Sequence, residues 1–227
     1  MTVLRCVPMG KPAAFFDMDN TLLRIETGMS WVKFLRSRGE LSSRMFAKAI
    51  YWSAMYKLAV LDMDAVFTKL IEDLEGDPES DMLAKCEIWH RDHVSREVAP
   101  GALVAIEQHR QAGDVIVLAT GSTQYAARPV ARGVGIDHVL SSQLEVDPAS
   151  GNFTGKPAAL CFGQHKVTLA ERWAREHDVD LSRSTFYSDS YNDLPLFERV
   201  GRAIAINPDA RLRRHARKRG WPVIEWA

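Results

Sequence analysis

Residues 13–23 read AAFFDMDNTLL, and this stretch decides the fold. A short apolar run is followed by two carboxylates, Asp17 and Asp19, which come where the run ends. Side chains alternate along a strand, so residues two apart point to the same side. If the run is a buried strand of a parallel sheet, both carboxylates emerge at the carboxyl end of that sheet, where ligands bind in open α/β folds.

The chemistry of this pair points to a metal and to acid–base work. Two adjacent carboxylates repel each other, so the pair favours a bound divalent cation, and hard oxygen ligands suit Mg²⁺. One carboxylate can then act as a nucleophile while the other moves protons. The alternative is an Asp-rich turn that caps the next helix, and the short motif alone leaves it open.

Strands alternate with helices over most of the chain. Residues 115–119 read VIVLA, a continuous apolar run typical of a central parallel strand, and a helix from Pro100 to about Gly113 precedes it. Further strands are expected at 138–140, 185–187, 203–206 and 222–224, helices at 123–132, 166–177 and 209–219, and a β-hairpin at 144–153. This order predicts an α/β fold with a doubly wound, Rossmann-like parallel sheet.

One block of the chain breaks the alternation. Segments 30–38, 42–61 and 64–74 carry apolar residues at three- and four-residue spacings, which indicates helices, and glycines separate them. We therefore predict two domains: an α/β core of residues 11–27 and 97–227, and a helical cap of residues 28–96 inserted after the first strand.

The composition narrows the class of partner and the compartment. The formal net charge is zero, so neither nucleic acid nor a membrane surface is expected as a main partner. The three cysteines, Cys6, Cys86 and Cys161, are odd in number and widely spaced, which favours free thiols in a reducing compartment. The residues before the first strand lack an apolar signal segment, so we expect a cytoplasmic protein. The oligomeric state is not indicated.

Polar residues follow three of the predicted strands, and Lys166 opens the helix before the last of them. These residues are Asp17 and Asp19, Thr120 and Gly121, and Asp189 and Asp193. Carboxylates suit Mg²⁺, which also keeps waters and a phosphate oxygen. A hydroxyl, an unobstructed amide and a lysine charge stabilise the equatorial oxygens of a transferring phosphoryl group. The set predicts a metal site beside a phosphate site.

These residues form four motifs in chain order: Asp17 to Thr21, then Thr120, then Lys166, then Asp189 with Asp193. With four motifs in this order, the chain resembles the haloacid dehalogenase superfamily of phosphotransferases over nearly its full length. The helical insert looks like a type 1 cap. Residues 187–196, YSDSYNDLPL, and the tail with NPD at 207–209 and RGWP at 219–222 are similar to the phosphoserine-phosphatase-like subgroup.

The resemblance implies a role for each motif residue. Asp17 would attack phosphorus and form an aspartyl-phosphate, and Asp19 would protonate the leaving alkoxide and then activate water. Thr120, the amide of Gly121 and Lys166 would hold the phosphoryl oxygens.

The resemblance also implies the metal ligands. Asp17, Asp189 and the backbone carbonyl of Asp19 would bind Mg²⁺. Asp193, with Asn192 beside it, would lie one layer further out and orient a water or Lys166.

Glu26, nine residues after Asp17, is the candidate for substrate recognition. In phosphoserine phosphatases a glutamate at this place is associated with the substrate amino group, and a cap arginine with its carboxylate. No arginine lies between Arg44 and Arg91 here. This pattern favours a phosphorylated amine or amino acid such as histidinol phosphate or phosphoserine. The alternative for Glu26 is a first-turn acid that the helix dipole favours.

The leading prediction is thus a Mg²⁺-dependent phosphomonoester hydrolase for a small soluble phosphometabolite. Two alternatives remain open. An aromatic-rich helix around residues 46–58 would suit a phosphatase of lysophospholipid phosphates at a membrane surface. A non-catalytic regulatory binding protein of the same fold is the other, although four intact motifs favour an enzyme.

Overall fold

The computed structural model describes residues 10–57 and 63–226, which form an α/β fold around one seven-stranded sheet. The strand order is β4-β3-β2-β1-β5-β6-β7, and every neighbouring pair is parallel except β3 and β4. The strands are β1 (Ala13–Phe16), β2 (Val115–Thr123), β3 (His138–Val146), β4 (Phe153–Ala159), β5 (Thr185–Ser188), β6 (Arg202–Ile206) and β7 (Val223–Ile224). The predicted doubly wound sheet is confirmed, and β1, where the strand order reverses direction, is its switch point.

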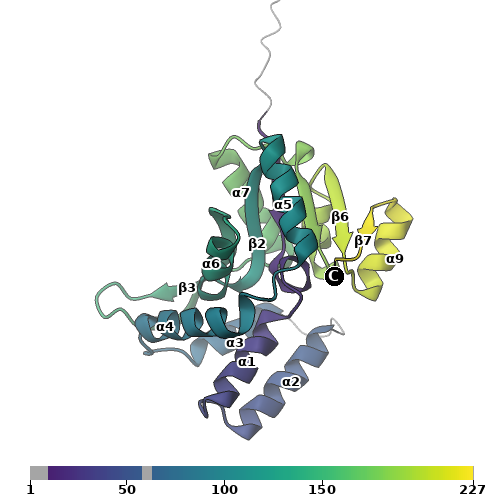
Figure 1. Ribbon diagram of the computed structural model, residues 1–227. Coiled ribbons are helices and arrows are strands. Elements are labelled where there is room, and N and C mark those ends of the chain that lie inside the picture. Colours follow the sequence, from purple (N-terminus) through teal and green to yellow (C-terminus); the bar gives the residue numbers. More distant parts are fainter. Residues whose placement is uncertain (1–9, 58–62, 227) are drawn as a thin grey trace, which may run out of the picture.

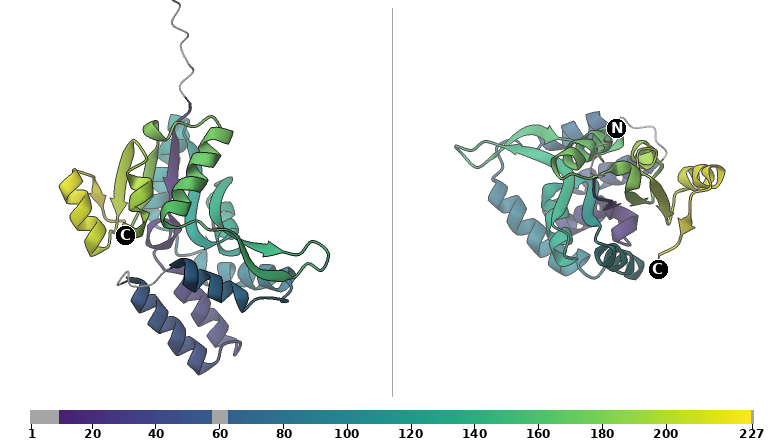
Figure 2. Two further views of the ribbon diagram at one scale, coloured as in Figure 1. Left: turned by 180° about the vertical axis from the view of Figure 1, so that it is seen from behind. Right: turned by 90° about the horizontal axis from the view of Figure 1, so that it is seen from above.

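Helices cover both faces of this sheet. In Figures 1 and 2, α5 (Pro100–Ala112) and α6 (Gln124–Gly133) lie on one face, and α7 (Gly163–Glu176) lies on the other. The short α8 (Leu194–Phe197) and α9 (Ala210–Arg219) pack on the α7 side. Two separate apolar clusters fill the space between the sheet and each helix layer.

The first strand is the buried centre of both clusters. Its four residues are between 0% and 1% exposed. Phe15 meets Trp173 of α7 edge to face, with ring centroids 5.6 Å apart, while Phe16 points to the opposite layer and stacks on Tyr187 at 4.6 Å. Burial of each phenylalanine ring contributes about 1.5–3 kcal/mol, so the strand is fixed in position and register. The point where Asp17 leaves the sheet is fixed with it.

Four helices extend beyond the carboxyl ends of the strands (Figure 1). They are α1 (Thr27–Ser37), α2 (Ser43–Lys57), α3 (Met63–Glu72) and α4 (Glu79–Trp89). The sequence predicted the first three, but α4 was included only as part of a mostly helical block. Residues 58–61 of the second predicted helix lie outside the described residues. The division into core and cap stays a prediction.

The hairpin of β3 and β4 differs from its prediction. The sequence indicated a short strand at 138–140 and a separate hairpin arm, whereas β3 runs without a break from His138 to Val146. The hairpin also contacts the helical insert, because the amide of Gly76 donates to the carbonyl of Phe153 at 2.9 Å. The hairpin is therefore shared between the sheet and the insert.

In the described ranges, no helix is both long and apolar enough to cross a membrane. Cys86 and Cys161 are buried free thiols, and Cys6 lies outside the described residues.

Candidate active site

The turn Met18–Leu22 carries the first motif out of the sheet. The amide of Asp17 still donates to the carbonyl of Tyr187 on β5 at 2.9 Å, and the turn closes where the amide of Leu23 donates to the carbonyl of Met18 at 2.8 Å. Asn20 has a φ of 52°, in the left-handed region that asparagine tolerates better than most residues. The turn therefore brings Asp17 and Asp19 out at one edge of the sheet.

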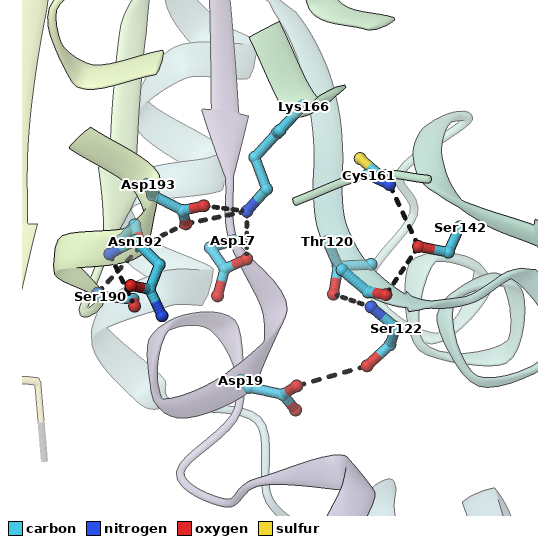
Figure 3. A network of polar contacts seen from close by, with 12 residues as sticks. Asp17, Asp19, Thr120, Ser122, Ser142, Cys161, Lys166, Ser190, Asn192 and Asp193 are labelled. Atoms are coloured by element: carbon cyan, nitrogen blue, oxygen red, sulfur yellow. Dashed lines mark hydrogen bonds and ion pairs between the residues drawn. The ribbon is translucent and has the colours of Figure 1, made fainter. Parts of the chain in front are cut away.

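Lys166 lies at the centre of a buried ion-pair network (Figure 3). Its ammonium is 2.9 Å from Asp17 Oδ1 and 2.7–2.8 Å from the two carboxylate oxygens of Asp193. All three residues are at least nine-tenths buried, and Lys166 is only 2% exposed. The lysine predicted for the phosphate site thus joins the first and last motifs directly.

The buried network contains one lysine and two carboxyl groups, so acidic groups outnumber cations in it. Burial raises the pKa of Asp17 above its ordinary range, Asp193 and Asp19 add to the rise, and Lys166 offsets only part of it. Burial opposes the charge of Lys166, yet Asp17 and Asp193 together raise its pKa. The lysine is therefore firmly cationic, and a second cation would find several carboxylates beside it.

Asp19 is held by Thr27, the first residue of α1, and by Ser122 of β2. The amide of Thr27 donates to its Oδ1 at 2.7 Å, and the Ser122 hydroxyl donates to its Oδ2 at 3.3 Å. The Thr27 and Ser122 hydroxyls are 2.9 Å apart. Burial raises the pKa of Asp19 despite these hydrogen bonds, and the charge of Glu26 adds to the rise. This environment favours the protonated form of Asp19, which is the form that a general acid needs.

Hydrogen bonds from Ser142 hold the second motif, at Thr120, in position. Thr120, 1% exposed, accepts a hydrogen bond from the amide of Ser122 at 3.1 Å. Ser142 donates to the carbonyl of Gly121 at 2.8 Å and accepts from the amide of Cys161 at 3.1 Å, as Figure 3 shows. The loop before α7 is thereby tied to the end of β2, which brings Lys166 to the same edge as Thr120.

The fourth motif follows β5 in a single turn. The hydroxyl of Ser188 donates to Asp193 Oδ2 at 2.7 Å, and Ser190 caps the turn by accepting from the amide of Asn192 at 3.2 Å. Asp193 points to Lys166, and the role that the resemblance implies for it, to orient this lysine or a water, stays a prediction. Asn192 lies on the same turn (Figure 3), and its predicted role in support of the site stays a prediction.

Asp189 is a buried carboxyl whose ionised form a nearby cation would stabilise. Burial raises its pKa to about 9, and Asp17, Asp193 and Asp19 contribute, while a hydrogen bond from the Asn20 side chain lowers it. Several buried carboxyl groups that oppose one another's ionisation form an oxygen-rich site that a bound hard divalent ion would stabilise. Within residues 10–57 and 63–226, no three His, Cys, Asp or Glu side chains form a metal cluster. The Mg²⁺ assignment therefore relies on two side-chain carboxylates and the carbonyl of Asp19.

The structure brings all of the predicted motif residues to one edge of the sheet, and Glu26 lies near them. It is half-buried at the start of α1 and close enough to Asp19 to raise the pKa of that carboxyl. Its role toward a substrate stays a prediction. On α2, Met45, Ile50 and Tyr51 are exposed, whereas the side chains of 52–58 in the aromatic-rich segment lie outside the described part.

Sequence reasoning missed the hydroxyl residues that hold the motifs in place. Thr27, Ser122, Ser142 and Ser188 are of this kind. Ser122 and Ser188 each stand beside a motif residue and could have been suggested by that position. Ser142 lies far from any motif in sequence and carried no signal.

The chain matches the family model described as haloacid dehalogenase-like hydrolase over residues 14–198. It belongs to this family. A probable phosphatase of Mycobacterium tuberculosis is 30% identical over 97% of this hydrolase and 77% of its own length. A histidinol-phosphatase of Neisseria meningitidis is 27% identical over 95% of this chain and 99% of its own. A phosphoserine phosphatase of Mycobacterium tuberculosis is 32% identical, covering 94% and 70%.

Solved structures agree with this assignment. A Bordetella pertussis protein of unknown function is 29% identical and superimposes with a TM-score of 0.85 over 95% of this hydrolase and 98% of that chain. A phosphoserine phosphatase with a phospho-aspartyl intermediate analogue has a TM-score of 0.69 at 20% identity, covering 95% and 93%. At that identity the likeness shows the fold. The family predicted from the four motifs is confirmed.

Proposed function

We propose that this hydrolase is a Mg²⁺-dependent phosphomonoesterase that works through an aspartyl-phosphate on Asp17. The observation that carries the proposal is the buried contact of Lys166 with Asp17 and Asp193, with Asp19 two residues after Asp17. It combines a fixed carboxylate, a fixed cation and a proton-holding acid, which are the parts that phosphoryl transfer needs.

In the first half-reaction, a carboxylate oxygen of Asp17 attacks phosphorus. The new Asp17 O–P bond forms as the P–O bond to the leaving group breaks, and Asp19 gives its proton to the leaving oxygen. Lys166 uses Asp17 Oδ1, so we assign Oδ2 as the attacking atom. The raised pKa of Asp19 supports its role as the acid, because a poor alkoxide leaving group requires a proton.

In the second half-reaction, Asp19 takes a proton from a water molecule. The water oxygen bonds to phosphorus, the Asp17 O–P bond breaks, and inorganic phosphate leaves. Thr120, the Gly121 amide and Lys166 would hold the phosphoryl oxygens in both steps.

Asp17, Asp189 and the backbone carbonyl of Asp19 would hold the Mg²⁺ ion. When bound, it would offset the charge of the phosphoryl oxygens. The support for this ion is the negative excess around Asp189.

For the substrate we propose a small phosphorylated amine or amino acid, with histidinol phosphate ahead of phosphoserine. Relatives named histidinol-phosphatase and phosphoserine phosphatase support this class. Glu26 near Asp19 supports the amine, and the lack of an arginine from 45 to 90 weighs against a substrate carboxylate.

The test is hydrolysis of a phosphometabolite panel with Mg²⁺, including histidinol phosphate, phosphoserine, phosphocholine, phosphoglycolate and a lysophospholipid phosphate in vesicles. Acid-quenched protein should carry one phosphoryl group on the peptide that contains Asp17, as read by mass spectrometry. Asp17→Asn should lose at least roughly 10³-fold in kcat and show no such label, because an amide is a far weaker nucleophile. Preference for the vesicle substrate would favour the membrane alternative, and no turnover of any compound would favour a binding protein.

A further inference from the structure

The last described residues of the chain lie against β5, which neighbours the strand β1 that leads into the catalytic turn, Met18–Leu22. After β7 the chain returns, and the ring of Trp226 stacks on Tyr187 of β5 with centroids 5.6 Å apart. Tyr187 in turn stacks on Phe16, the residue before Asp17. In Figure 1 this end of the chain lies at the carboxyl edge of β6.

Trp226 occupies a slot that only a glycine leaves open. A Cβ on Gly101, at the start of α5, would lie 2.4 Å from Trp226 Cδ1 and 2.6 Å from its Cγ. Real Cβ contacts are almost never shorter than 3.0 Å, so a side chain at 101 would displace the indole. The position of Trp226 therefore depends on Gly101 of α5 as well as on the chain after β7, here called the tail.

Asn207, just after β6, links this docked tail to the catalytic turn. Its Oδ1 accepts from the amide of Trp226 at 2.9 Å, and its Nδ2 donates to the carbonyl of Trp226 at 3.2 Å. The same Nδ2 also donates to the carbonyl of Asn20 at 3.4 Å. One side chain thus holds the tail and the turn together.

Asn20 connects Asn207 with the carboxyl groups of the site. Its backbone is in the left-handed region, with a φ of 52°, and its side chain lies near enough to Asp189 to lower the pKa of that carboxyl. Asparagine tolerates this conformation, and the hydrogen bond that the Asn20 carbonyl accepts from Asn207 stabilises it here. The amide of Asp209, two residues after Asn207, also donates to the carbonyl of Asp189 at 2.9 Å, so the position of Asp189 is coupled to the segment that Asn207 begins.

We propose that Asn207 and the docked Trp226 are positioning residues, which act through Asn20 to orient Asp189 for Mg²⁺. This inference rests on the proposed Mg²⁺-dependent reaction. Groups one layer behind metal ligands commonly change metal affinity by about 10–100-fold, and Asn207 lies one contact further out. We accordingly expect roughly a 3–10-fold effect on the apparent Mg²⁺ affinity when this link is broken.

The decisive variant is Asn207→Gly. The φ of Asn207 is 41°, which glycine adopts without strain, so the change removes the side chain and keeps the backbone. Gly101→Ala is the second variant: it favours the helix and keeps every hydrogen-bonding group, but pushes Trp226 out of its slot. Trp221→Ala is the matched control, because Trp221 stacks on Phe197 in the other apolar cluster.

Each protein is titrated with Mg²⁺ alone by calorimetry, and the Mg²⁺ concentration for half-maximal hydrolysis of p-nitrophenyl phosphate is measured beside it. Both midpoints should rise in Asn207→Gly and Gly101→Ala, while kcat at saturating Mg²⁺ stays within about threefold of wild type. In Trp221→Ala both midpoints should remain at the wild-type values even if the melting temperature falls.

Folded Asn207→Gly with wild-type midpoints would overturn the inference and leave the proposed function intact. If Asn207→Gly does not fold, wild-type midpoints in Gly101→Ala have the same meaning. Equal shifts in Trp221→Ala would also overturn it, because a general loss of stability would then explain them. A wild-type protein that neither binds Mg²⁺ nor responds to it would remove the proposed function together with the inference.

Discussion

Replacement of Lys166 by methionine tests the reasoning about the site most directly. Methionine has a similar length and fits an apolar place, so Lys166→Met removes the charge with little change in volume. Asp17 and Asp193 then lose the ammonium that lies 2.9 Å and 2.7–2.8 Å from their oxygens. Both carboxylates stay buried, at 7% and 5% exposure.

The expected loss of stability follows from this burial. Removal of one partner from a buried ion pair costs about 3–5 kcal/mol. For a chain of this size, 1 kcal/mol corresponds to about 2–4 °C, so the melting temperature should fall by roughly 6–20 °C. Burial already raises the pKa of Asp17, so this carboxyl takes up a proton in the variant and the lower half of the range is expected. The kcat/KM should drop by at least about 10²–10³-fold, as for other oxyanion donors.

Melting curves and initial rates of p-nitrophenyl phosphate hydrolysis, both with Mg²⁺, provide the measurement. Lys69→Met is the control, because Lys69 Nζ and Glu72 Oε2 are also 2.8 Å apart but on an exposed helix face. Exposed pairs contribute little, so this variant should keep its melting temperature and its rate. If Lys166→Met melted like Lys69→Met, or kept a tenth of the wild-type rate, the buried network would not have the role assigned to it.

Three further results are expected. Hydrolysis should stop in excess chelator, and full rates after dialysis against chelator would exclude a role for the metal ion. Ca²⁺ should inhibit, because Ca²⁺ prefers more and longer oxygen contacts than Mg²⁺ and would take both oxygens of Asp17 as ligands. Ser122→Ala should lower kcat about fivefold, equivalent to roughly 1 kcal/mol, because Asp19 loses one hydrogen bond. KM should change little. An unchanged kcat would show that Ser122 does not position Asp19. The kcat/KM for histidinol phosphate should exceed that for phosphoserine by about 10–100-fold, and Glu26→Gln should reduce that ratio. A preference for phosphoserine would mean that a lysine, Arg24 or Arg91 binds the carboxylate of the substrate.

The sequence predicted the sheet well because its central strands contain continuous, mostly buried apolar runs. The runs at 13–16, 115–119 and 203–206 have this pattern, and all of them became strands. The hairpin was less well predicted, because β3 leaves the sheet core and pairs with β4 over the insert, where long-range contacts decide the pairing. The boundary of α4 was missed because charged residues interrupt its apolar spacing.

The motif residues were predictable for a different reason, namely that reactive groups at strand ends stand out from apolar neighbours. The hydrogen-bond donors that lie far from the motifs in sequence were not. Ser142 bonds to Gly121 across 21 positions of sequence, and Asn207 reaches Asn20 across 187. Such contacts depend on how separate loops meet in space, and a single serine or asparagine in a loop has too many ordinary explanations to be singled out.

The meeting of Asp17 with Lys166 also follows from two periodicities once α7 is placed on its face of the sheet. Phe15 and Asp17 are two residues apart along an extended chain, so both point to the α7 layer. Lys166 and Trp173 are seven residues apart, close to two helical turns, so both point from α7 to the sheet. Phe15 meets Trp173, and Asp17 meets Lys166, which requires α7 to run antiparallel to β1. One residue more or fewer between Lys166 and Trp173 would turn the lysine about 100° away from Asp17, so the packing of Phe15 on Trp173 sets the direction of the ammonium.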